Sequence, residues 1–136
     1  MKTKVYLSYI ILAAVLLSMI SSCNFSKVKI GEVRMMYGDN DDGRIAYRFS
    51  TFTGFERGSA EAEKGQTISF DYQASVEKGN LIIEWQSPGG DVLWRKNLTE
   101  NDHGADELKV ESPGKYTVII QGKGAGGDFD VAWRVK

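Results

Sequence analysis

Hydrophobic and polar residues alternate with a period of two along much of the chain from Ile30 onward. Successive side chains of an extended strand point to opposite faces, so this alternation predicts strands that bury one face. The alternating runs cover residues 30–37, 45–50, 68–74, 81–85, 92–95, 108–110, 116–120 and 129–135.

Short segments rich in Gly, Asp, Asn and Pro separate these runs and predict turns. They are residues 38–43, 77–80, 87–91 and 112–115. No segment after Cys23 shows the spacing of three and four residues that an amphipathic helix requires. About eight short strands with glycine turns between them predict an all-β fold, an antiparallel β-sandwich or jelly roll over residues 32–136.

Two segments of the predicted sandwich resemble a known class. Residues 113–118, Pro-Gly-Lys-Tyr-Thr-Val, together with 127–131, resemble the closing strands of secreted bacterial β-sandwiches of the pre-peptidase C-terminal type. Residues 87–92, Ser-Pro-Gly-Gly-Asp-Val, are similar to the proline-glycine turn of the same class. The resemblance implies a sandwich in an extracytoplasmic setting, and it implies no catalytic residue.

The first 22 residues differ from the rest of the chain. Lys2 and Lys4 precede the uncharged run 5–20, an arrangement typical of an export signal. Ile20-Ser21-Ser22-Cys23 follows and resembles the lipobox of bacterial lipoproteins. The resemblance implies cleavage between Ser22 and Cys23, removal of residues 1–22 as a signal peptide, and attachment of a diacylglyceryl group to Cys23.

An uncleaved anchor helix, or cleavage at another position, is the alternative interpretation of this segment. Cys23 is the single cysteine of the chain, so no intramolecular disulfide competes with its lipidation. Two or more acyl chains anchor a protein stably. We therefore expect the protein on the extracytoplasmic face of the cell membrane, with residues 23–31 as the lipidated cysteine and a short tether.

The charge of the chain limits its partners. It has 17 basic and 18 acidic side chains, and cleavage would remove Lys2 and Lys4, which leaves a mildly acidic domain. Nucleic acid as a partner usually requires a basic surface, so we do not expect it. We interpret the domain as a non-enzymatic interaction module that contacts envelope components or another protein. The alternative is a module that binds a carbohydrate or cell-wall glycan.

Residues 122–127, Gly-Lys-Gly-Ala-Gly-Gly, match the GxGxxG spacing of a dinucleotide-binding loop. Such a loop requires a following helix whose N-terminus faces the pyrophosphate. Residues 128–136 alternate like a strand instead. We therefore predict a hairpin loop at 122–127 and no bound cofactor.

An acidic cluster and a lone histidine are further candidates for chemistry. Asp39, Asp41 and Asp42 could supply oxygen ligands to calcium, but their spacing is not that of an EF-hand, so a polar hairpin tip is the main interpretation. His103, the single histidine, is predicted to lie in a solvated loop. No serine has the surroundings of a nucleophile elbow, so a hydrolase is the lesser alternative.

Aromatic residues are the remaining candidates for a binding surface. Trp85 and Trp133 each share a strand face with aliphatic residues, which predicts that both lie in the core. Trp94 lies in a run without clean alternation and is a candidate for the surface.

Phe52 and Phe55 lie on either side of Gly54, and Phe52 is out of phase with Phe49. Residues an odd number apart face opposite sides of a strand, so Phe52 leaves the inner face unless a bulge intervenes. Either a bulge returns Phe52 or Phe55 to the core, or these residues are exposed and bind a partner.

We predict that Cys23→Ser abolishes incorporation of labelled fatty acid and leaves an uncleaved precursor, because the thioether requires the thiol. Metabolic labelling and the mass of the isolated protein measure both effects. A wild-type protein that takes up no label and keeps residues 1–22 would contradict the lipoprotein interpretation.

Overall fold

Three long strands make up most of the fold. The computed structural model describes residues 33–136, and the expected signal peptide, Cys23 and tether lie outside these residues. The long strands are β2 (Arg44–Ala62), β3 (Thr67–Gln86) and β6 (Gly114–Val135). The shorter strands are β1 (Val33–Asp41), β4 (Val92–Leu98) and β5 (Asp102–Lys109).

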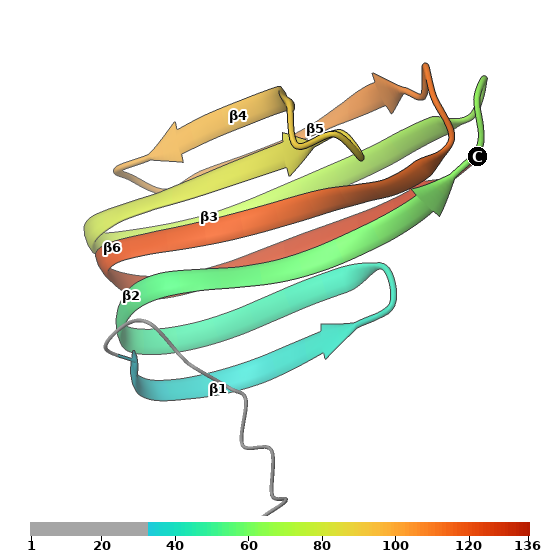
Figure 1. The fold of residues 1–136 in the computed structure, drawn as a ribbon. Coiled ribbons are helices and arrows are strands. Elements are labelled where there is room, and N and C mark those ends of the chain that lie inside the picture. The colour runs from blue at the N-terminus through green and yellow to red at the C-terminus, as the bar shows by residue number, and fades with distance from the viewer. Residues whose placement is uncertain (1–32) are drawn as a thin grey trace, which may run out of the picture.

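Neighbouring strands are antiparallel, in the order β1-β2-β6-β3-β4, and β5 also pairs with β3. β5 pairs with residues 67–74 of β3, whereas β4 pairs with residues 81–86. The strands β2, β3 and β6 all turn back on themselves on the same side of the molecule (Figure 1). The fold is therefore an antiparallel β-sandwich made from one sheet that folds across its middle.

We name the two halves of the folded sheet after their edge strands. The β4 sheet contains β4 and the segments 54–62, 80–86 and 114–122. The β5 sheet contains β1, β5 and the segments 44–49, 67–76 and 127–135.

Bulges and glycines produce the fold-back. The register shifts around Phe52 in β2, and it shifts again between Val76 and Asn80 in β3. In β6 the bend falls at 122–127. A Cβ at Gly122 would lie 2.3 Å from the Phe52 ring, and one at Gly127 (φ 133°) would lie 1.9 Å from the Ser75 carbonyl oxygen. Glycine is thus required where the bent strands approach each other.

The inner faces of the two sheets form the core. Trp85 of the β4 sheet is fully buried, and its ring centroid lies 5.8 Å from that of Trp133 on the β5 sheet. Gly58 makes room for this contact, because a Cβ there would lie 2.4 Å from the Trp133 ring. Burial of a large apolar side chain contributes about 1.5–3 kcal/mol. The largest fully buried side chains are Trp85, Tyr116, Phe52, Phe129, Ile45, Ile68, Leu81, Ile83, Ile120, Val118 and Val131.

The predicted all-β sandwich is confirmed, but its strands are fewer and longer than expected. The described residues form six strands, because the runs 68–74 and 81–85 join into β3 and the runs 116–120 and 129–135 join into β6. Residues 77–80 are therefore a bend within a strand rather than a turn. The predicted hairpin loop at 122–127 is wrong for the same reason.

Other local predictions are confirmed. Residues 87–91 connect β3 to β4. The turn predicted over 38–43 is shorter than expected, because residues 38–41 pair with β2 as part of β1 and only Asp42-Gly43 form the turn. Trp85 and Trp133 lie in the core, with 0% and 9% of their surface exposed. Within the described part of the chain, no helix has the length and apolar character needed to cross a membrane.

We predict that Gly127→Ala destabilises the domain by about 3 kcal/mol or more, because it combines backbone strain with overlap against the Ser75 carbonyl. Gly124→Ala is the matched control, since Gly124 also has a positive φ (60°) but an added Cβ there would meet no atom within 4 Å. The control should cost only about 1–2 kcal/mol. Urea unfolding followed by tryptophan fluorescence measures both. Equal losses of stability would show that close approach at the corner contributes nothing beyond strain.

Candidate functional site

The outer face of the β4 sheet presents side chains from four strands in regular rows. Cross-strand pairing aligns β2, β6, β3 and β4 in that order. The rows are Phe55, Gln121, Ile82, Asn97; then Arg57, Ile119, Glu84, Arg95; then Ser59, Thr117, Gln86, Val92. We call these twelve residues the outer platform.

An aromatic ring stands exposed at one margin of the platform. Phe55 is 44% exposed, and the guanidinium carbon of Arg57 lies 4.5 Å from the centroid of its ring. This cation–π contact holds the ring beside its neighbours. A depression of about 180 Å³ lies next to it, with Ile82 and Ile119 between the polar side chains of Glu84 and Gln121.

Hydrogen bonds orient the polar side chains on the other half of the platform. Gln86 Nε2 donates to Glu84 Oε1 at 2.6 Å, and Arg95 Nη1 lies 3.6 Å from Glu84 Oε2. Asn97 Oδ1 accepts from the neighbouring Asn80 Nδ2 at 3.1 Å. The platform therefore combines one exposed ring, an apolar centre and several ordered donors and acceptors, which suits a ligand with both apolar and hydroxylated faces.

The outer face of the β5 sheet carries a larger groove of about 520 Å³. Small side chains, Ala105 and Ala132, line it beside charged ones. Ser69 Oγ donates to Glu107 Oε1 at 2.8 Å, and Lys136 Nζ lies 3.5 Å from the same oxygen. The Ser69 hydrogen bond and the Lys136 charge hold the pKa of Glu107 below its ordinary value. In this groove Glu107 is engaged with Ser69 and Lys136, and the two aromatic residues that line it, Phe70 and Trp133, are buried.

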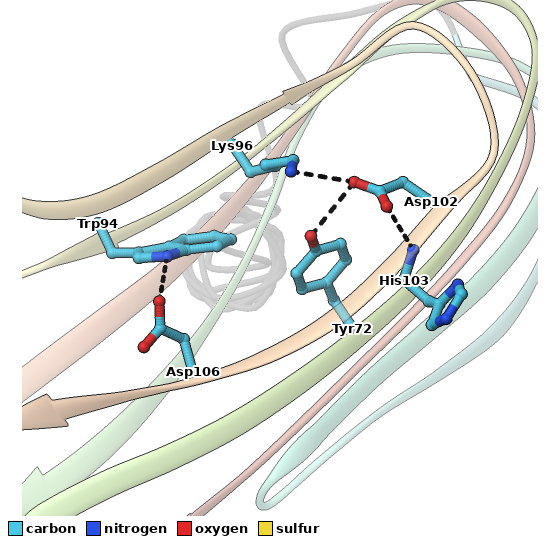
Figure 2. A network of polar contacts seen from close by, with 6 residues as sticks. All are labelled: Tyr72, Trp94, Lys96, Asp102, His103 and Asp106. Carbon is cyan, nitrogen blue, oxygen red and sulfur yellow. Dashed lines mark hydrogen bonds and ion pairs between the residues drawn. The ribbon is translucent and has the colours of Figure 1, made fainter.

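A polar network closes the sandwich between β4 and β5 (Figure 2). Trp94 Nε1 donates to Asp106 Oδ2 at 3.0 Å, and Lys96 Nζ lies 3.2 Å from Asp102 Oδ2. Tyr72 donates its hydroxyl to the same Asp102 oxygen at 3.2 Å. Each contact from β4 to β5 joins one sheet to the other, so this network stabilises the edge of the sandwich.

Trp94 belongs to this edge rather than to an open binding surface. Its ring packs against Phe70, at 4.9 Å between centroids, and against Tyr72 at 5.7 Å. It is half-buried against the core. The run without clean alternation around Trp94 reflects a register shift next to its cross-strand partner Trp85.

The ion pair at this edge changes the pKa values of both members. The hydrogen bond from Lys96 lowers the pKa of Asp102, and the same bond raises the pKa of Lys96. A lowered carboxyl pKa stabilises the fold above the ordinary carboxyl value, and this contribution is lost as the pH falls through the lowered pKa. The raised lysine pKa stabilises below the ordinary lysine value, and its contribution is lost as the pH rises through the raised pKa.

Phe52, a predicted surface candidate, lies in the core instead. Only 1% of its surface is exposed, and its ring centroid lies 5.3 Å from that of Phe49. The register shifts on both sides of Phe52 are the bulge that returns it to the inner face. Phe55, three residues further on, points outward.

The other candidates from the sequence are not brought together. Asp41 and Asp42 are exposed at the β1–β2 turn, and the side chain of Asp39 lies outside the described part. Among the described residues, no group of three or more His, Cys, Asp or Glu could hold a metal ion. His103 lies in β5 rather than in a loop, and its imidazole points away from Tyr72 and Lys96 (Figure 2).

Sequence reasoning missed most of the platform. Gln121, Ile82 and Glu84 come from strands far apart in the sequence, and only their register brings them beside Phe55. The alternation of 81–85 and 116–120 did indicate which of their residues face outward. It contained no information on which strands are neighbours.

No family model and no curated protein matches the chain. Among solved structures, the chain is similar to the carbohydrate-binding module CBM4, with 10% identity and a TM-score of 0.49 over 82% of this chain and 80% of that one. It is also similar to the module CBM6cm-2 of Cellvibrio mixtus lichenase 5A in complex with cellotriose, with 12% identity and a TM-score of 0.44 over 78% and 88%.

A third similar structure is PliG of Aeromonas hydrophila, a periplasmic inhibitor of g-type lysozyme. It has 14% identity and a TM-score of 0.42, over 75% of this chain and 95% of that one.

We predict that Asp102→Asn reduces the loss of folding stability that accompanies a fall in pH, because the variant lacks the carboxyl group whose lowered pKa stabilises the fold. It should also remove part of the loss of stability at alkaline pH, since Lys96 loses its charged partner. Urea midpoints between about pH 2 and pH 11 measure both effects. Glu100→Gln is the control, because it removes an exposed carboxylate from the turn before β5. If the stability of Asp102→Asn depended on pH in the same way as that of the wild type, the stabilising role of the Lys96–Asp102 ion pair would be contradicted.

Proposed function

We propose that this protein is a lipid-anchored, non-enzymatic module of the cell envelope that binds a glycan on its outer platform. The observation that carries the proposal is the exposed Phe55 ring, held by Arg57 beside a shallow depression with a polar rim. Exposed aromatic rings of this kind often supply a large share of binding energy.

A sugar ring fits this combination of groups. The C–H bonds on one face of a pyranose are weakly positive and pack against the negative face of an aromatic ring. Its hydroxyl groups require donors and acceptors around the stack, which the Gln121 amide and the Glu84 carboxylate supply. The neighbouring rows add polar side chains along the sheet, among them Thr117, Gln86 and Arg95, so a chain of sugars stacked on Phe55 meets further donors and acceptors.

The proposal also includes a lipid anchor and a role in binding rather than in catalysis. The lipobox resemblance of residues 20–23 supports attachment through Cys23, and the short tether would keep the domain near the bilayer. The polar network supports a binding role over catalysis, because the Asp102 carboxylate already accepts bonds from Lys96 and Tyr72 while the His103 imidazole points away.

A protein partner is the second candidate function, and a specific observation favours it. Val92 and Leu93 are 51% and 45% exposed on β4, and β4 pairs with β3 alone among the described strands. An edge strand with exposed apolar side chains can pair with an extended segment of another protein.

We predict that Phe55→Ala weakens glycan binding by about tenfold or more, because it removes the stacking surface. Calorimetry against neutral and carboxylated oligosaccharides measures the affinity. The stability of the variant should stay close to that of the wild type, since Phe55 is exposed. Phe55→Tyr keeps a ring and should retain binding.

Asp71→Ala is a further control, because Asp71 lines the groove on the opposite outer face. Unchanged affinity of Phe55→Ala, together with loss of binding in Asp71→Ala, would move the site to the β5 sheet. If Leu93→Asp prevented cross-linking to an envelope protein while no glycan bound the wild type, the protein-partner function would replace the glycan proposal.

A further inference from the structure

The depression beside Phe55 carries an inference about the class of sugar, and it rests on the proposed function. We infer that the outer platform recognises an N-acetylated amino sugar, whose acetamido group occupies the depression while its ring stacks on Phe55. The residues that line the depression place a hydrogen-bond acceptor, a donor and two apolar side chains where the parts of that group require them.

Four of the lining residues form a small rectangle on the sheet. Gln121 and Ile82 are cross-strand partners, and so are Ile119 and Glu84 in the next row. Cross-strand neighbours are about 4.8 Å apart, and alternate residues of one strand are about 6.8 Å apart. Gln121 and Glu84 therefore occupy opposite corners of the rectangle, with Ile82 and Ile119 at the other two.

The two isoleucines make an apolar spot among polar neighbours. Ile82 faces away from the core between the sheets and lies outside the core cluster, yet only 5% of its surface is exposed. Ile119 is partly exposed beside it. A methyl group placed against them leaves water at a gain in free energy, whereas a hydroxyl group in the same place loses hydrogen bonds to water.

The two polar corners match the rest of an acetamido group. In a trans secondary amide, the N–H and the C=O point in opposite directions. An amide between the corners can donate its N–H to the Glu84 carboxylate and accept a hydrogen bond from the Gln121 side-chain amide. A hydroxyl group is too short to bond both, because the backbone positions of opposite corners are about 7–8 Å apart.

Glu84 is held in place for this role. Gln86 Nε2 donates to its Oε1 at 2.6 Å, and Arg95 Nη1 lies 3.6 Å from its Oε2. Each carboxylate oxygen can accept more than one hydrogen bond, so Glu84 keeps the capacity to accept from a ligand. Only 15% of its side-chain surface is exposed, and a hydrogen bond made there is partly shielded from water.

The stacking position and the depression are adjacent. Phe55 is the cross-strand partner of Gln121, so a sugar ring on Phe55 lies about one strand spacing from the rectangle. The nitrogen of an amino sugar is bonded directly to the ring, and its acetamido group can therefore enter the depression while the ring stays stacked. A sugar with a hydroxyl at that position keeps the stacking but leaves the depression unfilled.

Calorimetry of the lipidated protein, in neutral detergent micelles without sugar headgroups, tests the inference with three matched trisaccharides. The trimer of N-acetylglucosamine has the acetamido group, the trimer of glucosamine has a free amine, and cellotriose has a hydroxyl. We expect the N-acetylated probe to bind about tenfold or more tightly than either of the others, because only it fills the apolar spot and makes both amide hydrogen bonds.

The outcomes separate this inference from the proposed function. Equal affinity for cellotriose, or tighter binding of the amine, would overturn the acetamido assignment while the glycan function stands. Binding of other oligosaccharides but none of these three would overturn the assignment as well. If no oligosaccharide of any kind bound the wild type, the proposed function itself would be overturned.

Gln121→Glu should remove most of the preference for the N-acetylated probe over cellotriose, because a carboxylate cannot donate to the acetamide carbonyl. Gln73→Glu is the matched control, since it makes the same change on the outer face of the β5 sheet. Ile119→Thr should also reduce the preference, whereas Ile119→Val should retain it. Urea unfolding checks that each variant is folded. An unchanged preference in both Gln121→Glu and Ile119→Thr would overturn the placement of the acetamido group.

Discussion

The corner at which β2, β3 and β6 turn back is the constraint on which the rest of the structure depends. One sheet has one apolar face to bury, and folding it across its middle buries that face against itself. The bent strands approach so closely there that side chains at Gly122 or Gly127 would overlap with the Phe52 ring or the Ser75 carbonyl. Glycine lets the strands bend at this point while β6 keeps both of its neighbours on either side.

The same corner decides which aromatic residues face outward. The bulge around Phe52 returns that ring to the core, where it packs beside Phe49 and Phe129. Beyond the bulge, Phe55 faces outward, and Arg57 holds its ring over the platform. The fold-back also brings β4 and β5 to one edge, where Trp94 and Lys96 reach across to Asp106 and Asp102. The fold-back therefore produces both the contacts that stabilise the β4–β5 edge and the outward position of Phe55 on the platform.

The distribution of charge separates structural surfaces from the proposed binding face. Charged side chains at the β4–β5 edge and on the outer β5 sheet pair with one another over distances of 2.5–3.8 Å. On the outer platform, the exposed Phe55 ring lies against Arg57 and beside a shallow depression. This exposed ring is the physical basis of the proposed glycan function.

The sequence by itself determined the fold class and the inner or outer position of most strand residues, because alternation and turn composition are local properties. Trp85 and Trp133 were predicted in the core on this basis, and they lie there. Only the tertiary structure decided that the glycines at 122–127 bend a strand, that Phe52 is buried and that Trp94 closes an edge. The pairing of Gln121, Ile82 and Glu84 beside Phe55 was likewise decided there. These features depend on register and on close approach between segments distant in the chain, and no local pattern encodes which strands become neighbours.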